Sequence, residues 1–356
     1  MPKIIHVETL LSEHEYDQKE VFDVLKDLWK EKYFNLDRIE KIFENTSVGK
    51  RYFPVELSRY KTLDTFEDKN NAWQEAARRL APKLVTKLIE NSGVDTDSID
   101  LFCSNSVTGL SVPSIESIII NEIGLKRSTI RLPIFGLGCL AGIAGLNRVC
   151  DFLKGSPKSA ALFLSIEFCS LTMQKEDLSM ANIISSGLFG DGLACVLVVG
   201  DEHPLANRPG LDYQGSRSEV FSDTERVMGW DFVNSGMKVV LSSDVPTISK
   251  EMVPPVVNEF LIDQNLSKDQ IRHYIAHPGG PKVLGALVEG LGLSQEALCL
   301  SYETLKEYGN LSSVSVLFVL KEFFSRSVKN DGEDCLALAM GPAFCVELSH
   351  FIWRDS

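Results

Sequence analysis

The stretch PIFGLGCLAGIAGLNRVCDFLKG, residues 133–155, decides the fold of this chain. A short apolar run meets several glycines and one cysteine, Cys139, and continues with Ala, Gly and Leu at helical spacing. This change of period predicts a strand that ends near Gly138 and a helix over 140–154. A cysteine at such a junction has two interpretations. It is a buried packing residue, as free cysteine often is, or a nucleophile at the positive end of a helix, where the thiolate is favoured.

Length, composition and charge bound the class of protein. The chain has 356 residues, 44% of them hydrophobic and 24% charged, which is typical of a folded protein long enough for two core-bearing halves. A net charge of −13 argues against a general nucleic-acid binder. The N-terminal stretch lacks the pattern of a secretory signal, and the longest apolar runs, such as 193–200, are too short to span a membrane.

We therefore expect a cytoplasmic protein whose eight cysteines are thiols. None of them forms a C-x-x-C pair, which argues against a zinc site and against dithiol redox chemistry.

Strands and helices alternate in two successive series. The first ~95 residues are charged, with helical spacing at 15–33 and 70–93. The first series then has strands at 98–105, 129–138, 159–169 and 193–200 between helices at 112–124, 140–154 and 181–190. After a polar connection at about 200–236, the second series has strands at 237–243, 272–277, 334–341 and 344–353, a helix at 246–264 broken by its prolines, and helices at 279–292 and 311–327. Because the strands are apolar on both faces, we expect an α/β fold whose sheets are covered on each side. The two successive series indicate two similar halves, residues 1–205 and 206–356.

Two polar residues of the second half lie at turns. His277 ends a strand and precedes Pro-Gly-Gly, a turn that fixes where the imidazole points. It either caps the strand end by hydrogen bonding or faces the thiol, where a neutral imidazole can pair with a thiolate. Asn310, in EYGNLSS, is either a helix N-cap or an amide donor to a carbonyl oxygen that becomes negative during a reaction. The residues alone leave both interpretations open.

Six motifs occur in a fixed order: GCLAG, EFCSLT, LFGDG, IAHPGGPKVL, YGNLSS and MGP. In order and spacing they resemble the motifs of the type III polyketide synthases, the chalcone synthase-like group of the thiolase superfamily, from about residue 40 to the C-terminus. The resemblance implies a thiolase-like αβαβα layered fold that is active as a homodimer. It also implies that Cys139, His277 and Asn310 form the catalytic triad.

The resemblance implies a reaction as well. Cys139 takes the acyl group of an acyl-CoA, and decarboxylation of malonyl-CoA supplies the carbanion that extends it in repeated Claisen condensations before ring closure. CoA thioesters are the substrates, and no bound cofactor or metal is needed. The stretch CSLTMQKEDLSMAN, residues 169–182, is similar to bacterial alkylpyrone and alkylresorcinol synthases, which implies a medium- to long-chain fatty acyl starter and two or three extensions.

Further site residues follow from the same resemblance. Phe189, in LFGDG, matches a gatekeeping phenylalanine between the CoA tunnel and the cavity, and Val239 stands where the family has a second one, which would widen the entrance. Val112 aligns with a residue that reaches into the partner subunit. The other predicted substrate-binding residues are Ser312 near the triad, the cavity-lining Thr108, Cys169 and Thr172, and Gly341 and Pro342, which the loop AMGPA retains from the family's GFGPG. The predicted CoA-binding residues are Arg38, Lys41 and Arg51.

Three rival functions remain. An initiating ketoacyl-ACP synthase shares the fold and the triad but condenses only once, and it differs in the sequence after its histidine. A hydroxymethylglutaryl-CoA synthase needs a glutamate base, for which no matching motif is present. A catalytically inactive homologue that binds acyl-CoA is disfavoured by the intact triad.

Overall fold

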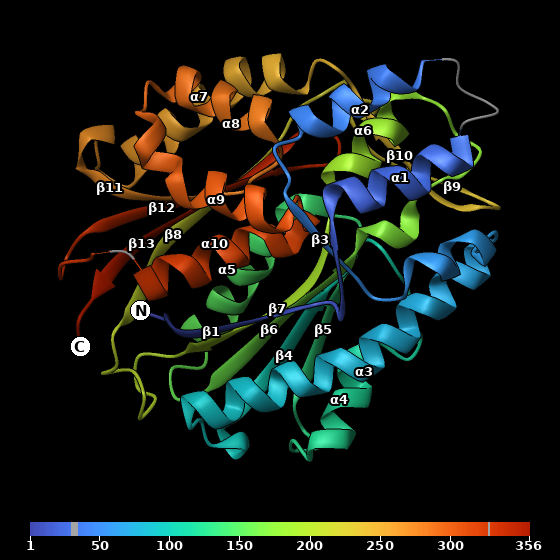
Figure 1. Ribbon diagram of the computed structural model, residues 1–356. Helices are drawn as coiled ribbons and strands as arrows, with labels where there is room; N and C mark the ends of the chain where they lie inside the picture. The colour runs from blue at the N-terminus through green and yellow to red at the C-terminus, as the bar shows by residue number, and fades with distance from the viewer. Residues whose placement is uncertain (30–34, 327) are drawn as a thin grey trace.

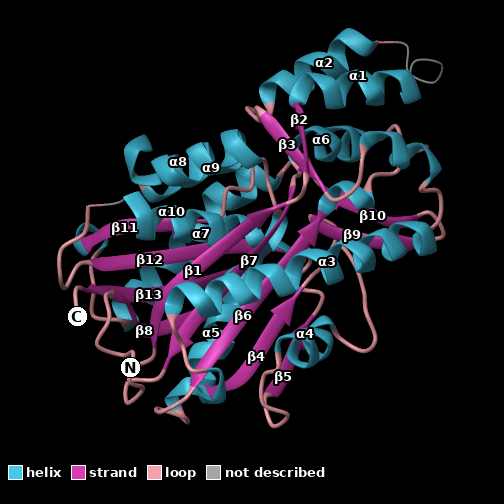
Figure 2. Ribbon diagram, turned by 60° about the horizontal axis from the view of Figure 1, so that its bottom comes forward, coloured by secondary structure: helices cyan, strands magenta, loops and turns pink. Residues whose placement is uncertain are grey.

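The computed structural model describes residues 1–29, 35–326 and 328–356. Two of the helices expected from the sequence, at 15–33 and 311–327, end outside these described residues. The strands of the central sheet are β1 (Lys3–Leu11), β4 (Ile99–Asn105), β5 (Ile130–Ile134), β6 (Ala160–Phe168), β7 (Asp191–Val199), β8 (Gly210–Val220), β11 (Ile271–Ala276), β12 (Asp334–Gly341) and β13 (Cys345–Arg354). Their order across this nine-stranded sheet is β11-β12-β13-β8-β1-β7-β6-β4-β5 (Figure 1, Figure 2).

Two short hairpins and a set of helices surround this sheet. The hairpins are β2 (His14–Asp17) with β3 (Lys50–Phe53), and β9 (Met228–Val233) with β10 (Gly236–Leu241). The helices are α1 (Gln18–Trp29), α2 (Leu36–Asn45), α3 (Phe66–Ser92), α4 (Ile115–Ile123), α5 (Ala141–Lys154), α6 (Met180–Leu188), α7 (Val245–Asp263), α8 (Pro281–Leu291), α9 (Cys299–Tyr308) and α10 (Ser315–Arg326). Within the described ranges, no helix is long and apolar enough to cross a membrane.

The strand pairing repeats on the two sides of the β1–β8 junction. On one side β4 pairs in parallel with β5 and β6, and β7 and β1 follow in antiparallel order. On the other side β11 and β12 are parallel, and β13 and β8 follow in antiparallel order. The division of the chain into residues 1–205 and 206–356 stays a prediction.

Core packing shows that the helices form layers with the two parts of the sheet. Leu164 of β6 packs with α3 in one core cluster, and Phe163 on the opposite face packs with α5 and α10 in a second. In the other part of the sheet, Ala337 of β12 belongs to that second cluster, and Leu338 packs with α7 and α8 in a third. The succession is therefore helix, sheet, helix, sheet, helix, with α3 and α7–α8 outermost (Figure 1). The predicted α/β layered fold is confirmed.

Several sequence expectations were wrong. The first ~95 residues were expected to be helical, but β1 lies at the centre of the sheet between β7 and β8. The segment 200–236 was expected to be a connection, but it holds β8 and β9. β8 is polar because much of it is only half-buried, and its strand geometry comes from pairing with β13 along nearly its whole length. α7 is continuous through Pro254 and Pro255, where burial of Val253, Val256 and Val257 in the third cluster offsets the lost backbone hydrogen bonds.

Phe163 offers a test of this layered core. It is fully buried between β6 and α5, so Phe163→Ala should lower the free energy of unfolding by about 3–5 kcal/mol. Phe232→Ala, at a side chain that is 58% exposed, is the matched control and should cost far less. Urea unfolding followed by circular dichroism measures both, and equal midpoints for the two variants would contradict this packing.

Candidate active site

Cys139 lies where β5 passes into α5. The connection contains Gly138, at φ +52°, and Cys139 follows it in a single 3₁₀ turn, Gly138–Leu140, that leads directly into α5. A Cβ on Gly138 would lie 2.5 Å from Cδ of Pro342, so only glycine fits between this turn and the end of β12. The predicted placement of Cys139 at a strand-to-helix junction is confirmed.

The start of α5 presses against the turn that precedes α10. A Cβ on Gly142 would lie 2.3 Å from the carbonyl oxygen of Ser313, so the two backbones are in direct contact. This approach places Cys139 Sγ 3.5 Å from Ser312 Oγ. Ser312 itself adopts a left-handed conformation, at φ +53°, which is uncommon for a residue with a side chain.

Asn310 connects this turn to the loop after β11. Its Oδ1 accepts a hydrogen bond from Ser312 N at 2.8 Å, as in the cap interpretation of this residue. Its Nδ2 donates to the carbonyl oxygen of Gly279 at 3.1 Å. An amide NH₂ carries two hydrogens, so this group can donate a second hydrogen bond to a bound substrate.

His277 lies immediately after β11, held by a hydrogen bond from its backbone N to Leu338 O at 2.9 Å. The side chain is only 2% exposed, and its Nδ1 has no hydrogen-bond partner among the described residues. Gly279 borders this ring, since a Cβ there would lie 3.7 Å from His277 Nε2. Cys139, Ser312, Asn310, Gly279 and His277 therefore form one continuous set of neighbours.

Burial sets the protonation of the thiol and the imidazole. It raises the pKa of Cys139 to about 12; the hydrogen bond from Ser312 opposes this shift, and the nearby Glu167 carboxylate adds to it. Burial also lowers the pKa of His277 to about 3. Desolvation is the largest contribution to the pKa of Cys139, and it opposes the ionisation that a helix N-terminus favours. An ionised thiol at this position stays a prediction.

Glu167 is a residue of this site that the sequence analysis missed. It lies in β6 and is fully buried, accepting hydrogen bonds from Val107 N, from Thr108 Oγ1 at 2.8 Å and from Ser313 Oγ. Burial raises its pKa to about 7 against the effect of these donors. A single acidic residue within the apolar run SAALFLSIEFC was the signal available for it.

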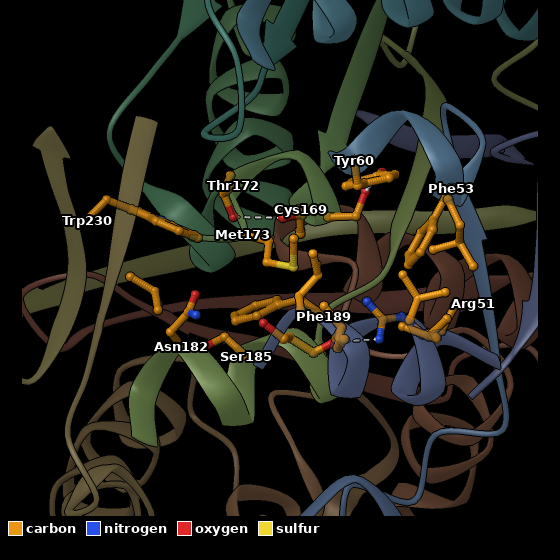
Figure 3. A pocket seen from close by; sticks show the side chains of 18 residues that line it. Arg51, Phe53, Tyr60, Cys169, Thr172, Met173, Asn182, Ser185, Phe189 and Trp230 are labelled. Carbon is orange, nitrogen blue, oxygen red and sulfur yellow. Dashed lines mark hydrogen bonds between the residues drawn. The ribbon is translucent and has the colours of Figure 1, made fainter. Parts of the chain in front are cut away.

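A pocket lies on the other side of Phe189 from Asn310, and Figure 3 shows the residues that line it. It holds about 570 Å³ of empty space, part of it open to solvent. Four predicted substrate-binding residues line it, namely Cys169, Thr172, Phe189 and Val239. Phe189 connects the pocket to Asn310, because the two residues form a parallel β-bridge.

Of the remaining predicted residues, only Arg51 belongs to this pocket in the described part of the chain. Gly341 and Pro342 pack against Leu137 and Gly138, directly behind the turn that carries Cys139. Arg38 and Lys41 are exposed on α2, whereas Arg51 is buried in the pocket wall and donates to Ser186 O at 2.8 Å. The three residues predicted to bind CoA thus differ in their exposure to solvent, since only Arg38 and Lys41 are exposed. No cluster of His, Cys, Asp and Glu in the described part of the chain is arranged to hold a metal ion.

Comparisons with known proteins identify the family of this chain. Residues 12–208 match the family model of FAE1/type III polyketide synthase-like proteins, and residues 213–352 match the C-terminal domain of chalcone and stilbene synthases. The chain is 35% identical to 1,3,6,8-tetrahydroxynaphthalene synthase of Streptomyces peucetius subsp. caesius, covering 98% of this chain and 92% of that protein. It is 33% identical to a putative chalcone synthase of Bacillus subtilis, covering 99% of each.

A solved structure shares the fold of this chain. The crystal structure of 1,3,6,8-tetrahydroxynaphthalene synthase from Streptomyces coelicolor A3(2) superimposes with a TM-score of 0.93 at 28% identity, over 99% of this chain and all of that one. Two family models that together span nearly the whole chain, and relatives of its full length, lead to one conclusion: this chain belongs to the type III polyketide synthases, acyltransferases that perform decarboxylating condensations.

Proposed function

We propose that Cys139, His277 and Asn310 are the catalytic residues of this enzyme. The observation that carries the proposal is the unbroken set of contacts from Cys139 through Ser312, Asn310 and Gly279 to His277 beside a buried pocket. Thiol, imidazole and amide supply a nucleophile, a proton acceptor and oxyanion donors.

Acyl loading begins from two neutral groups. As the thioester of the starter arrives, the proton of Cys139 passes to His277 and the sulfur attacks the carbonyl carbon. Because each ion stabilises the other, the pair ionises together although each group alone resists it. The carbon–sulfur bond to CoA then breaks, and CoA leaves with the proton held by His277.

Extension uses the same donors. Malonyl-CoA loses CO₂, and the electrons of the broken carbon–carbon bond form an enolate whose oxygen accepts hydrogen bonds from Asn310 Nδ2 and from the protonated nitrogen of His277. The carbanion attacks the acyl carbon on Cys139, and a carbon–carbon bond forms as the carbon–sulfur bond breaks. Both products are accounted for: a chain two carbons longer on CoA, and a regenerated thiolate.

The proposed starter is a medium- or long-chain fatty acyl-CoA, extended two or three times to an alkylpyrone or alkylresorcinol. The apolar lining of the pocket supports an aliphatic chain, and Val239 at its wall leaves more room than a phenylalanine. We also propose that the exposed Arg38 and Lys41 contact the CoA phosphates. The buried Arg51 already donates to protein oxygens, and a CoA role for it has no such support. All eight cysteines are free, which supports a cytoplasmic location.

Mass spectrometry of the intact protein tests the loading step. Incubation with lauroyl-CoA should add one lauroyl group to the wild-type protein and none to Cys139→Ala. Malonyl-CoA added next should release products with two or three extensions. A single extension would favour the ketoacyl-ACP synthase-like rival, and no acylation by any acyl-CoA would favour an inactive homologue.

Two substitutions should move the pKa of Cys139 in opposite directions. Ser312→Ala removes the hydrogen bond that lowers this pKa, and Glu167→Gln removes the charge that raises it. Iodoacetamide alkylates the thiolate, so the rate of Cys139 alkylation, followed by peptide mass, rises with pH through the pKa of this thiol. The pH at which the rate rises should be higher for Ser312→Ala and lower for Glu167→Gln. At pH 8 the Cys139 alkylation rate should be lower than wild type for Ser312→Ala and higher than wild type for Glu167→Gln. Shifts in the same direction would contradict the electrostatics described here.

We propose further that the enzyme is a homodimer assembled through the β5 edge of the sheet. Apolar side chains are exposed along this edge and at the loop after β4: Val112 is 99% exposed, Ile130 51%, Phe135 48% and Leu132 36%. An apolar edge strand of this kind is seldom left uncovered in a monomer. Symmetric pairing of two copies would cover it.

The oligomeric state of surface variants tests this interface. Leu132→Asp should shift the mass measured by light scattering from dimer towards monomer. Val328→Asp, at a residue that is 86% exposed and far from β5 in sequence, is the control and should stay dimeric. A wild-type monomer at micromolar concentration would overturn the proposal.

A further inference from the structure

Helix α1 presents one apolar face to the pocket. Val21, Val24, Leu25 and Leu28 all line it. Their spacing of i, i+3, i+4 and i+7 places them in one stripe along a helix. The stripe is about 10 Å long, at 1.5 Å per residue. α1 therefore lies lengthwise along the pocket wall.

The N-terminal end of α1 is fixed by polar contacts. Gln18, its first residue, donates from Nε2 to the carbonyl oxygen of Gly187, at the end of α6, and accepts a hydrogen bond from Arg51 Nη1 at 3.3 Å. Arg51 is fully buried and also donates to Ser186 O, so it joins β3, α1 and α6 at one point. Figure 3 shows Arg51 in the pocket wall. The rest of the stripe meets the pocket through apolar side chains alone.

This anchor gives α1 a direction relative to the catalytic residues. Gln18 contacts Gly187, two residues before Phe189, and Phe189 lines the pocket and forms a β-bridge with Asn310. The Gln18 end of α1 is therefore anchored beside the segment that leads to the proposed catalytic residues. Along the stripe, Val21 comes first, Val24 and Leu25 follow, and Leu28 is farthest.

We propose that α1 sets the length of the starter chain that the enzyme accepts. The inference rests on the proposed fatty acyl starter and assigns its chain a course: from Cys139 past Cys169 and Arg51, then along the apolar stripe of α1 to Leu28. Val24 meets the middle of the chain and Leu28 meets its end. Met173 and Leu57 line the same pocket and add to the apolar surroundings of the chain.

A graded response to bulky side chains follows from this course. Val24→Phe blocks the stripe about 6 Å nearer to Cys139 than Leu28→Phe does, so it should exclude shorter chains. Leu28→Ala should admit longer chains than the wild type. Asp23→Phe adds the same bulk on the exposed side of α1 and serves as the matched control.

The test is the rate of Cys139 acylation by acyl-CoAs of even length from C6 to C16, followed by intact mass. Relative to C6, Leu28→Phe should lose activity only with the longest chains, and Val24→Phe should lose it from mid-length chains upward. Each loss should reach about tenfold, the equivalent of two fewer buried methylene groups. Asp23→Phe, on the exposed side of α1, should keep the wild-type rate of malonyl-CoA decarboxylation, and circular dichroism with thermal unfolding of every variant shows whether the fold is intact.

Two outcomes would overturn the proposal, and only the second would also overturn the proposed fatty acyl starter. If the wild type is acylated by fatty acyl-CoAs but Val24→Phe and Leu28→Phe keep its chain-length profile, then α1 does not measure the chain, and the proposed function stands. If no fatty acyl-CoA acylates the wild type while malonyl-CoA does, then the fatty starter is wrong and this role of α1 falls with it.

Discussion

The arrangement of the active site depends on one steric constraint, the contact between the start of α5 and the turn before α10. Gly142 brings the backbone of α5 against the carbonyl of Ser313, and Gly138 leaves room for Pro342 behind the nucleophile. Either Cβ would push apart elements that belong to different ends of the chain. Interiors at crystal-like density transmit such a displacement instead of absorbing it, so the distance between Cys139 and Ser312 is fixed by residues that take no part in the chemistry.

The same packing determines the electrostatics. His277 is buried and Cys139 is half-buried, and desolvation shifts both pKa values towards the neutral imidazole and the neutral thiol. The low polarity that keeps them neutral strengthens every hydrogen bond to an oxyanion formed between them. Glu167 lies behind Ser313 with its own oxygens occupied by protein donors, so it adds negative potential without competing for a substrate.

The elements predicted correctly from the sequence are those whose own residues carry a strong local pattern. The apolar strand β6 and the glycine-rich junction at Cys139 carry strong local patterns, and both were predicted correctly. β1 and β8 were missed because their strand geometry depends on partners far away in the chain, β7 and β13. The buried position of Arg51 was missed for a related reason, because its neighbours in the sequence give no sign that the fold surrounds it. Glu167 carried a local signal in its apolar run, but its donor Ser313 is far away in the chain. The ordered motifs indicated which residues to examine, and the contacts among them are visible only in three dimensions.

The central place of β1 has a consequence for biosynthesis. Lys3 pairs with Val199 on one side and with Asp212 on the other, so β1 is synthesised some two hundred residues before the strands that flank it. At ordinary translation rates of about 5–20 residues per second, that delay is on the order of ten seconds or more. Throughout it the Ile4 and Val7 side chains lack their final surroundings, and the nascent polypeptide depends on chaperones or on transient local collapse to keep this segment from associating with other chains.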